Sequence, residues 1–140
     1  MIDPTEADLH ALLDAETIAV VGCSATPGKA AHDVPAYLQQ QGYEIVPVNP
    51  YRDEILGREA ADSLADVSER VDLVDVFRPS EEVSGIVDAV IERVERRGDV
   101  QGLWLQLGIR DDDAAGRARD AGLTVVQDRC LKVEHGRLRD

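Results

Sequence analysis

The sequence predicts an α/β fold built on a doubly wound parallel sheet with helices on both faces. Short apolar runs alternate with segments of helical periodicity, which is the order of elements in successive βαβ units. Several runs are apolar at every position, as in strands that are covered on both faces. Right-handed crossovers then lead to a Rossmann-like sheet of five strands, for which we expect the order 3-2-1-4-5. We expect the 140 residues to form a single domain, 1–140, with one core.

Each predicted strand stops at a turn or at a residue that breaks extended structure. The first stops at Gly22 and the second at Asn49-Pro50. Trp104 falls in an apolar strand and is expected in the core. Asp75 falls in the third strand, and its carboxylate can remain solvated if that strand lies at the sheet edge. The strands are predicted at residues 18–21, 44–48, 73–77, 103–107 and 124–127.

Helices are indicated by N-cap residues and by apolar residues three and four positions apart. Asp3 followed by Pro4 predicts a helix start, and the leucines beyond share one face. The clearest helix begins at Ser80, carries a continuous stripe of valine and isoleucine, and ends at Gly98. The other predicted segments are a helix that ends at Gly42, one turn of helix within 51–70, and a polar helix at 111–121.

Acidic residues dominate the composition. The net charge is −13, from 28 Asp and Glu against 15 Lys and Arg, and such a surface repels nucleic acid. Lysine occurs only at positions 29 and 132. An Asp-rich, Lys-poor composition is associated with cytoplasm at very high salt, where screening removes the self-repulsion. We therefore expect a halophilic source.

The sequence shows no pattern of export, membrane insertion or metal binding. The N-terminus has neither the basic nor the apolar region of a signal peptide. The apolar stretch 102–109 is far shorter than the roughly 20 residues of a membrane span. Cys23 and Cys130 have no partner at metal-ligand spacing. We expect a cytoplasmic protein without a metal or a membrane partner.

The segment 18–28 runs from an apolar strand into Gly22 and then into small, hydroxyl-bearing residues. A glycine at this point lets the backbone approach a ligand, and the N–H groups of the following helix can face an anion. The pattern is typical of a phosphate-binding turn and predicts a nucleotide-like ligand. We expect this ligand at the carboxyl ends of the strands, near a switch point between the first and fourth strands.

Two well-known nucleotide patterns do not fit. Ser24 stands where an NAD-binding turn has its second glycine, and Asn49 stands where an acidic residue would hold the ribose. A Walker A loop would need a hydroxyl-bearing residue after Lys29, and alanine follows instead. NAD and a magnesium-bound triphosphate are therefore disfavoured.

Short motifs lie at the ends of several predicted strands. They are Val20-Val21-Gly22-x-Ser24, Val48-Asn49-Pro50, Glu54-Ile55-Leu56-Gly57, Ser63-Leu64, Val71-Asp72-Leu73-Val74-Asp75-Val76-Phe77-Arg78, Trp104-Leu105-Gln106-Leu107-Gly108 and Asp128-Arg129-Cys130. In this order and spacing they make the chain similar to small stand-alone CoA-binding proteins. That family is related to the CoA-binding domains of succinyl-CoA synthetase alpha subunits and acyl-CoA synthetases. The resemblance covers nearly all of residues 5–138.

The resemblance implies coenzyme A or an acyl-CoA as ligand and assigns residues to its parts. The glycine turn, with Gly22, Ser24, Ala25 and Thr26, would meet the diphosphate. The segment after the second strand, Val48, Asn49 and Pro50, would flank adenine and ribose. The segment after the third strand, Phe77, Arg78 and Pro79, would border the pantetheine arm.

An acidic protein needs local cations to hold the phosphates of such a ligand. Lys29, Arg52 and Arg78 are the candidates, with Arg52 assigned to the 3′-phosphate, and the helix N-terminus near Asp33 adds a partial positive charge. Cys23 departs from the aliphatic residue that the family more often has. Its thiol therefore lies near the predicted ligand.

The residues leave two classes of function open. The first is a module that binds coenzyme A or an acyl-CoA without catalysis of its own. The second is an enzyme, either a thiol-dependent acyl or redox enzyme using Cys23 or Cys130, or a nicotinamide oxidoreductase that tolerates Ser24. The three histidines, at 10, 32 and 135, are expected at the surface, with His32 near the turn. The acidic run 111–113 is expected to complement a helix N-terminus.

Overall fold

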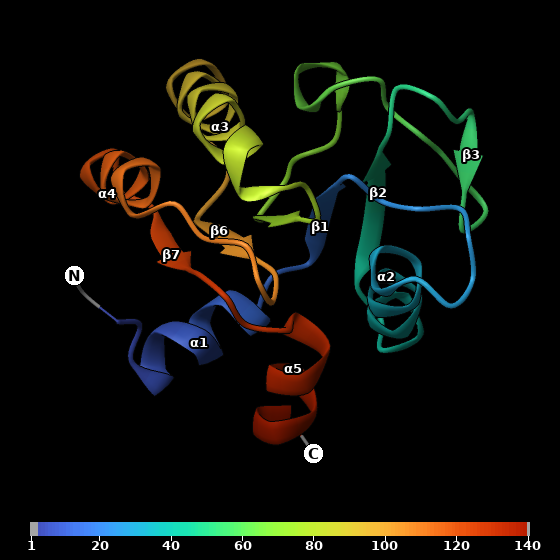
Figure 1. The fold of residues 1–140 in the computed structure, drawn as a ribbon, viewed down its shortest axis with the longest axis horizontal. Coiled ribbons are helices and arrows are strands. Elements are labelled where there is room, and N and C mark those ends of the chain that lie inside the picture. The colour runs from blue at the N-terminus through green and yellow to red at the C-terminus, as the bar shows by residue number, and fades with distance from the viewer. Residues whose placement is uncertain (1–2, 140) are drawn as a thin grey trace.

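The computed structural model describes residues 3–139 and shows a five-stranded parallel sheet between two layers of helices (Figure 1). The sheet order is β2-β1-β5-β6-β7. The strands are β1 (Thr17–Val21), β2 (Glu44–Val48), β5 (Leu73–Val76), β6 (Gly102–Leu105) and β7 (Thr124–Val126). The helices are α1 (Glu6–Leu13), α2 (Ala30–Gln40), α3 (Val83–Arg97), α4 (Asp112–Asp120) and α5 (Leu131–Arg139). Short 3-10 turns, η1 (Leu64–Asp66) and η2 (Ser80–Glu82), and a hairpin of β3 (Glu54–Ile55) and β4 (Arg58–Glu59) complete the chain.

The predicted fold class is confirmed, but the predicted strand order 3-2-1-4-5 is wrong. The third strand along the chain, β5, lies beside β1 instead of outside β2, so that the order is 2-1-3-4-5. Pro47 gives the physical reason for the position of β2. Its carbonyl faces away from β1 and accepts a hydrogen bond from the Ala61 amide at 2.9 Å. A further strand on that side would meet a residue without an N–H donor, so β2 is an edge strand.

The new order moves the topological switch point. The chain passes from β1 to one side of the sheet and returns to the other side at β5, so the switch lies between β1 and β5 and not between the first and fourth strands. Ligands of doubly wound sheets bind at the carboxyl ends of the strands at this point. The loops after β1 and β5 therefore frame the expected site.

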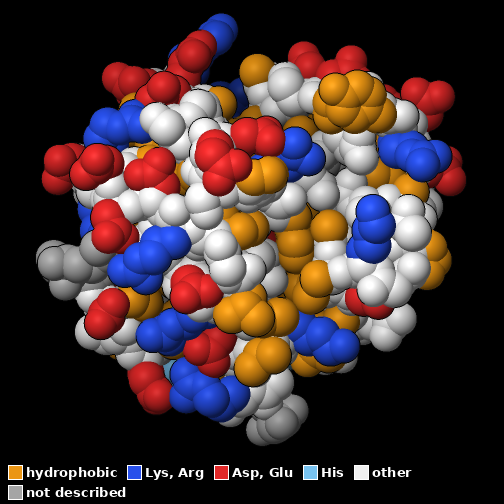
Figure 2. Space-filling view, viewed as in Figure 1, with side chains coloured by type: hydrophobic (Ala, Val, Ile, Leu, Met, Phe, Trp, Pro, Cys, Tyr) orange, Lys and Arg blue, Asp and Glu red, His pale blue; other side chains and the backbone are white. Residues whose placement is uncertain are grey.

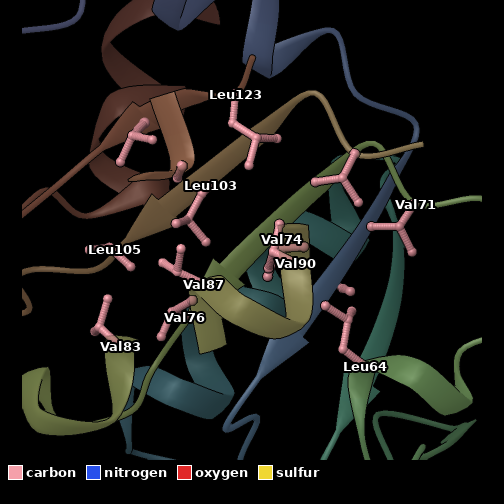
Figure 3. Packing of buried hydrophobic residues seen from close by; sticks show 14 of the residues in the cluster. Leu64, Val71, Val74, Val76, Val83, Val87, Val90, Leu103, Leu105 and Leu123 are labelled. Carbon is pink, nitrogen blue, oxygen red and sulfur yellow. The ribbon is translucent and has the colours of Figure 1, made fainter. Parts of the chain in front are cut away.

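The core has two parts, one on each face of the sheet. On one face, α3 directs Val83, Val87 and Val90 onto Val74 and Val76 of β5 (Figure 3). The other face is covered by α1, α2 and α5, as seen in Figure 1. Burying apolar side chains on both faces is the main force that holds the layers together.

Trp104 and His135 lie on the face covered by α1, α2 and α5. Trp104 is fully buried, as predicted, and its indole N–H donates to the Arg129 carbonyl at 2.8 Å. His135 was expected at the surface, but it is buried on α5. Its Nδ1 lies 2.7 Å from the Tyr37 hydroxyl, and the rings of Tyr37 and Tyr43 meet it edge-on. The surface prediction for His135 is therefore wrong.

Two helix boundaries differ from the predicted ones. Thr5, not Asp3, is the N-cap of α1: its hydroxyl accepts from the Asp8 amide, and the Asp8 carboxylate accepts from the Thr5 amide. The helix predicted from Ser80 begins as the turn η2 before α3, and Gly98 ends α3 in the left-handed conformation as expected. No helix of residues 3–139 is long and apolar enough to cross a membrane.

Candidate functional site

An open pocket of about 640 Å³ lies at the carboxyl ends of β1, β2 and β5. Its walls come from the loops after these strands, from η1 and from the first turns of α3. A larger hollow of about 830 Å³ lies against the β3–β4 hairpin, but half of its lining residues are acidic and it does not include Gly22. The pocket at the switch point is therefore the better candidate for an anionic ligand. Its lining residues are Val21, Gly22, Val48, Asn49, Pro50, Tyr51, Asp62, Ser63, Leu64, Arg78, Glu81, Glu82, Gly85, Ile86 and Ala89.

Gly22 holds three strand ends together. Its amide donates to the Val48 carbonyl of β2 at 3.1 Å, and its φ of 86° lies in the left-handed region. A Cβ at this position would lie 2.7 Å from Cδ of Arg78 and 2.8 Å from the carbonyl oxygen of Phe77. Only glycine fits such a close approach. The turn after β1 is thus packed directly on the segment after β5.

The loop between Gly22 and α2 is ordered by its own hydrogen bonds. The Ser24 hydroxyl accepts from the Thr26 amide at 3.0 Å, and the Ser24 amide donates to the Ala31 carbonyl at 3.0 Å. The Asp33 carboxylate accepts from the Gly28 amide at 3.1 Å. Hydrogen bonds from His32 and from Gly28 hold the pKa of Asp33 below its ordinary value. The loop is therefore tied to the first turn of α2.

Asn49 links the loops after β1 and β2. Its side-chain amide donates to the Cys23 carbonyl at 2.9 Å, and its side-chain oxygen accepts from the Tyr51 amide at 2.8 Å. An Asp or Glu at this position could not donate the first of these bonds. Asn49 does not fit the pattern of an NAD-binding turn, and its two hydrogen bonds give it a structural role in shaping the pocket.

The structure brings five of the predicted site residues to the pocket. They are Gly22, Val48, Asn49, Pro50 and Arg78. The others are not part of its lining. Ser24, Ala25, Thr26 and Lys29 lie in the loop before α2, Arg52 is exposed beyond Tyr51, Phe77 packs in the core part under α2, and Pro79 is exposed before η2.

Sequence reasoning missed most of the opposite wall of the pocket. Leu64 of η1 and Ile86 of α3 are apolar, and Tyr51, at the rim, is 90% exposed. Ser63-Leu64 was visible as a motif but had no role, and Ile86 was part of the predicted helix stripe. An exposed tyrosine directly after Asn49-Pro50 was the one signal of a contact surface.

The charge of the pocket is mostly negative. Among the described residues, Arg78 is the only Lys or Arg in its lining, against Asp62, Glu81 and Glu82. Arg78 donates from Nε to Glu82 Oε1 at 3.1 Å and from Nη2 to Glu82 Oε2 at 2.6 Å. This pair lowers the pKa of Glu82 and raises that of Arg78. Figure 2 shows acidic and basic side chains around the face and hydrophobic ones toward its middle.

The two cysteines are free thiols, and neither is fully exposed. Burial, followed by the charge of Asp75, raises the pKa of Cys23 to about 12. Cys23 is therefore a neutral thiol near pH 7 and a poor nucleophile. Cys130 is half-buried at the start of α5. No group of His, Cys, Asp and Glu side chains within residues 3–139 could hold a metal ion.

Asp75 lies in the middle of the sheet and not at its edge. It pairs in register with Val20 of β1 and Trp104 of β6, and it is fully buried. Neither carboxyl oxygen has a hydrogen-bond partner among the described residues. Burial raises the pKa of Asp75 well above its ordinary value, with a smaller opposing effect of the Val76 amide. The prediction that Asp75 is solvated at the sheet edge is wrong, because β5 lies between β1 and β6.

Asp75 makes stability depend on pH. The unfolded chain loses this proton above the ordinary pKa of 3.8, whereas the folded protein keeps it up to a higher pH. The free energy of unfolding therefore falls as the pH rises from 3.8 through the folded-state pKa. We expect Asp75→Asn, measured by urea unfolding between pH 4 and 8, to remove this slope. Exposed Asp120→Asn is the control, and an equal slope in both variants would contradict the assignment.

Residues 111–113 act at a helix start, as predicted. The Asp111 carboxylate accepts from the Ala114 amide at 3.0 Å and is the N-cap of α4. Asp112 and Asp113 follow in the first turn of the helix and are exposed. This acidic run therefore serves α4 and lies away from the pocket.

The fold and the pocket define a class: an α/β domain of the doubly wound type with an open pocket at the switch point, where such domains bind nucleotides. Within that class, the chain belongs to the family described as CoA binding domain, whose model matches residues 16–136. The resemblance predicted from the motifs is confirmed.

Similar proteins support this membership. The chain is 38% identical over 136 residues to the uncharacterized protein YneT of Bacillus subtilis (strain 168), across 96% of this chain and 97% of that protein. A solved structure of cell-free ID.343 from Thermus thermophilus is 42% identical with a TM-score of 0.87, across 96% and 98% of the two chains. The ADP-forming acetate–CoA ligase II of Archaeoglobus fulgidus is 29% identical over 116 residues, which are 81% of this chain but 17% of the ligase.

Proposed function

We propose that the pocket at the switch point binds coenzyme A or an acyl-CoA and that the chain performs no chemistry of its own on it. The observation that carries this proposal is the close packing of Gly22 on Phe77 and Arg78. It joins the ends of β1, β2 and β5 around one pocket in a chain of the CoA-binding family. The ligand would then contact all three strand ends.

The apolar part of the pocket lining suggests where adenine lies, and the resemblance to the family assigns the other parts of the ligand. Val48, Pro50, Leu64 and Ile86 offer an apolar surface for adenine, with the ring of Tyr51 at the rim. The diphosphate is assigned to the turn with Gly22, Ser24, Ala25 and Thr26. The pantetheine arm is assigned to the segment with Phe77, Arg78 and Pro79.

Lys29 and Arg52 are suited to contact phosphates. Within residues 3–139 neither side chain forms an ion pair or a side-chain hydrogen bond, and both are exposed. A cation without a competing partner can bind a phosphate without first breaking another contact. We assign Arg52 to the 3′-phosphate because it follows the segment that would flank the ribose.

Absence of catalysis is proposed from the state of Cys23. A thiol with a pKa of about 12 is not ionised at neutral pH, which disfavours the thiol-dependent enzyme at this position. Asn49 shapes the pocket through its donated hydrogen bond, which disfavours the nicotinamide oxidoreductase. The halophilic source and the cytoplasmic location stay predictions from the sequence.

Calorimetric titration with CoA, dephospho-CoA, NAD and ATP at molar salt tests the proposal. We expect CoA to bind with a Kd on the order of micromolar and dephospho-CoA to bind more weakly. Arg52→Gln should remove the difference between these two ligands. Arg70→Gln is the matched control, because Arg70 is exposed and pairs with Asp72 before β5, at the opposite end of the strands. Binding of NAD but not CoA would overturn the proposal.

A further inference from the structure

The guanidinium of Arg78 is positioned to hold a phosphate, but the carboxylate of Glu82 is already bound to it. The stem of Arg78 packs on Gly22, so its guanidinium is held beside the glycine turn. Two of its nitrogens, Nε and Nη2, donate to the two oxygens of Glu82 at 3.1 and 2.6 Å. A guanidinium presents the same fork of N–H groups to a carboxylate and to a phosphate. The ion pair and a ligand phosphate would therefore use the same donors.

We propose that Glu82 limits the affinity of the pocket for its phosphate-bearing ligand, because its carboxylate must leave Arg78 before a phosphate can bind there. This inference rests on the proposed function. It makes Glu82 an intramolecular competitor of the ligand and Arg78 a phosphate-contact residue. Neither role is required for the fold, since the pair lies at the surface where η2 joins α3.

The pair is accessible enough to exchange. The side chains of Arg78 and Glu82 are each 47% exposed. Half-exposed ion pairs of this kind contribute little to stability, because water competes for both groups. A ligand that carries several phosphate charges can therefore displace Glu82, but part of its binding free energy is used to break the ion pair. The released carboxylate adds to the negative charge of Glu81 and Asp62 in the lining and opposes binding.

Glu81 provides a matched control. It lines the same pocket and carries the same charge, but it pairs with no cation within residues 3–139. Removing either carboxylate changes the net charge by the same amount. Only removal of Glu82 frees Arg78. The two variants thus separate direct competition from general repulsion.

The test is calorimetric titration of CoA into the unchanged protein, Glu82→Gln, Glu81→Gln, Arg78→Gln and the double variant Arg78→Gln/Glu82→Gln. At molar salt the screening length is about 3 Å, so a distant charge has little effect on binding. We expect Glu82→Gln to tighten the Kd about three- to tenfold, and Glu81→Gln, which removes only general repulsion, to tighten it by less than about twofold. In the Arg78→Gln background, Glu82→Gln should give no gain.

The outcomes distinguish the two proposals. If the unchanged protein binds CoA and Glu82→Gln binds no tighter than Glu81→Gln, the competition is absent and the proposed function stands. Weaker binding by Glu82→Gln would mean that Glu82 holds Arg78 for the ligand, which also overturns the inference. If no variant binds CoA while all show unchanged melting curves, the proposed function fails and the inference fails with it.

Discussion

Replacing Gly22 by alanine is expected to lower the free energy of unfolding by about 2 to 4 kcal/mol. Alanine strains the backbone at a φ of 86°, and its methyl group would lie 2.7 Å from Cδ of Arg78 and 2.8 Å from the Phe77 carbonyl oxygen. The turn after β1 and the segment after β5 must then move apart. We expect the Kd for CoA to weaken about tenfold or more, because these two segments would no longer meet at the ligand.

Urea unfolding and calorimetric titration measure the two effects, and Gly28→Ala is the matched control. Gly28 also has a positive φ, of 96°, but an added Cβ would meet nothing within 4 Å. Its replacement should cost only about 1 kcal/mol, from backbone strain alone. If Gly22→Ala were as stable as Gly28→Ala, the close approach at Gly22 would carry no energetic weight.

Replacing Arg93 by methionine is expected to lower the free energy of unfolding by about 3 to 5 kcal/mol. Arg93 is buried on α3, and its guanidinium donates to the Asp99 carboxylate and to three backbone carbonyls, those of Leu64, Val67 and Glu69. Methionine would leave a buried carboxylate without its cation and three carbonyls without a donor. These carbonyls belong to the segment that places Leu64 in the pocket wall.

Arg96→Met is the control for this measurement. Arg96 lies one turn further on the same helix, is exposed, and pairs only with Glu92 among the described residues. Its replacement should change stability by less than about 1 kcal/mol. A similarly small effect of Arg93→Met would show that the buried guanidinium is dispensable.

The Arg93–Asp99 pair also predicts acid sensitivity. Burial alone would raise the pKa of Asp99, but hydrogen bonds from Arg93 and from the Val71 amide outweigh it and hold the pKa below 3.8. The stabilisation is therefore present above pH 3.8 and is lost as the pH falls through the folded-state pKa.

Periodicity predicted the positions of the strands and of most helices. A run of apolar residues marks a buried strand, and apolar residues three and four positions apart mark the buried face of a helix. The strand order could have been predicted as well. An inner strand is hydrogen-bonded on both sides, and Pro47 has no N–H to donate, which argues against the inner position that the order 3-2-1-4-5 gave to the second strand. The alternation of elements alone does not distinguish the two orders.

The missed elements have weak local patterns. Helix α5 buries a glutamate, Glu134, which is paired with Arg129 and Arg137. In the sequence, a glutamate predicts a surface position, because only tertiary contacts compensate the charge of a buried one. The hairpin β3–β4 has two residues in each strand, too few for any periodicity.

The position of the pocket was predictable because it depends on the backbone, whereas the pairing of charges in its lining was not. Gly22 and Asn49-Pro50 follow strands, and strand ends converge in any parallel sheet. The ion pair of Arg78 could not be predicted, because Glu82 lies four residues further along the chain and reaches Arg78 only through the turn η2. The burial of Asp75 could be predicted only from the correct strand order.

Pro47 has a further consequence for the behaviour of the protein in concentrated solution. An open edge strand offers a row of donors and acceptors to the strand of another molecule, and this is a route to aggregation. On the outer side of β2, Pro47 offers no donor, and its carbonyl and the Asn49 amide are already bonded to Ala61. The carboxyl-terminal half of this edge, next to the pocket, is thereby protected against sheet extension by a second chain.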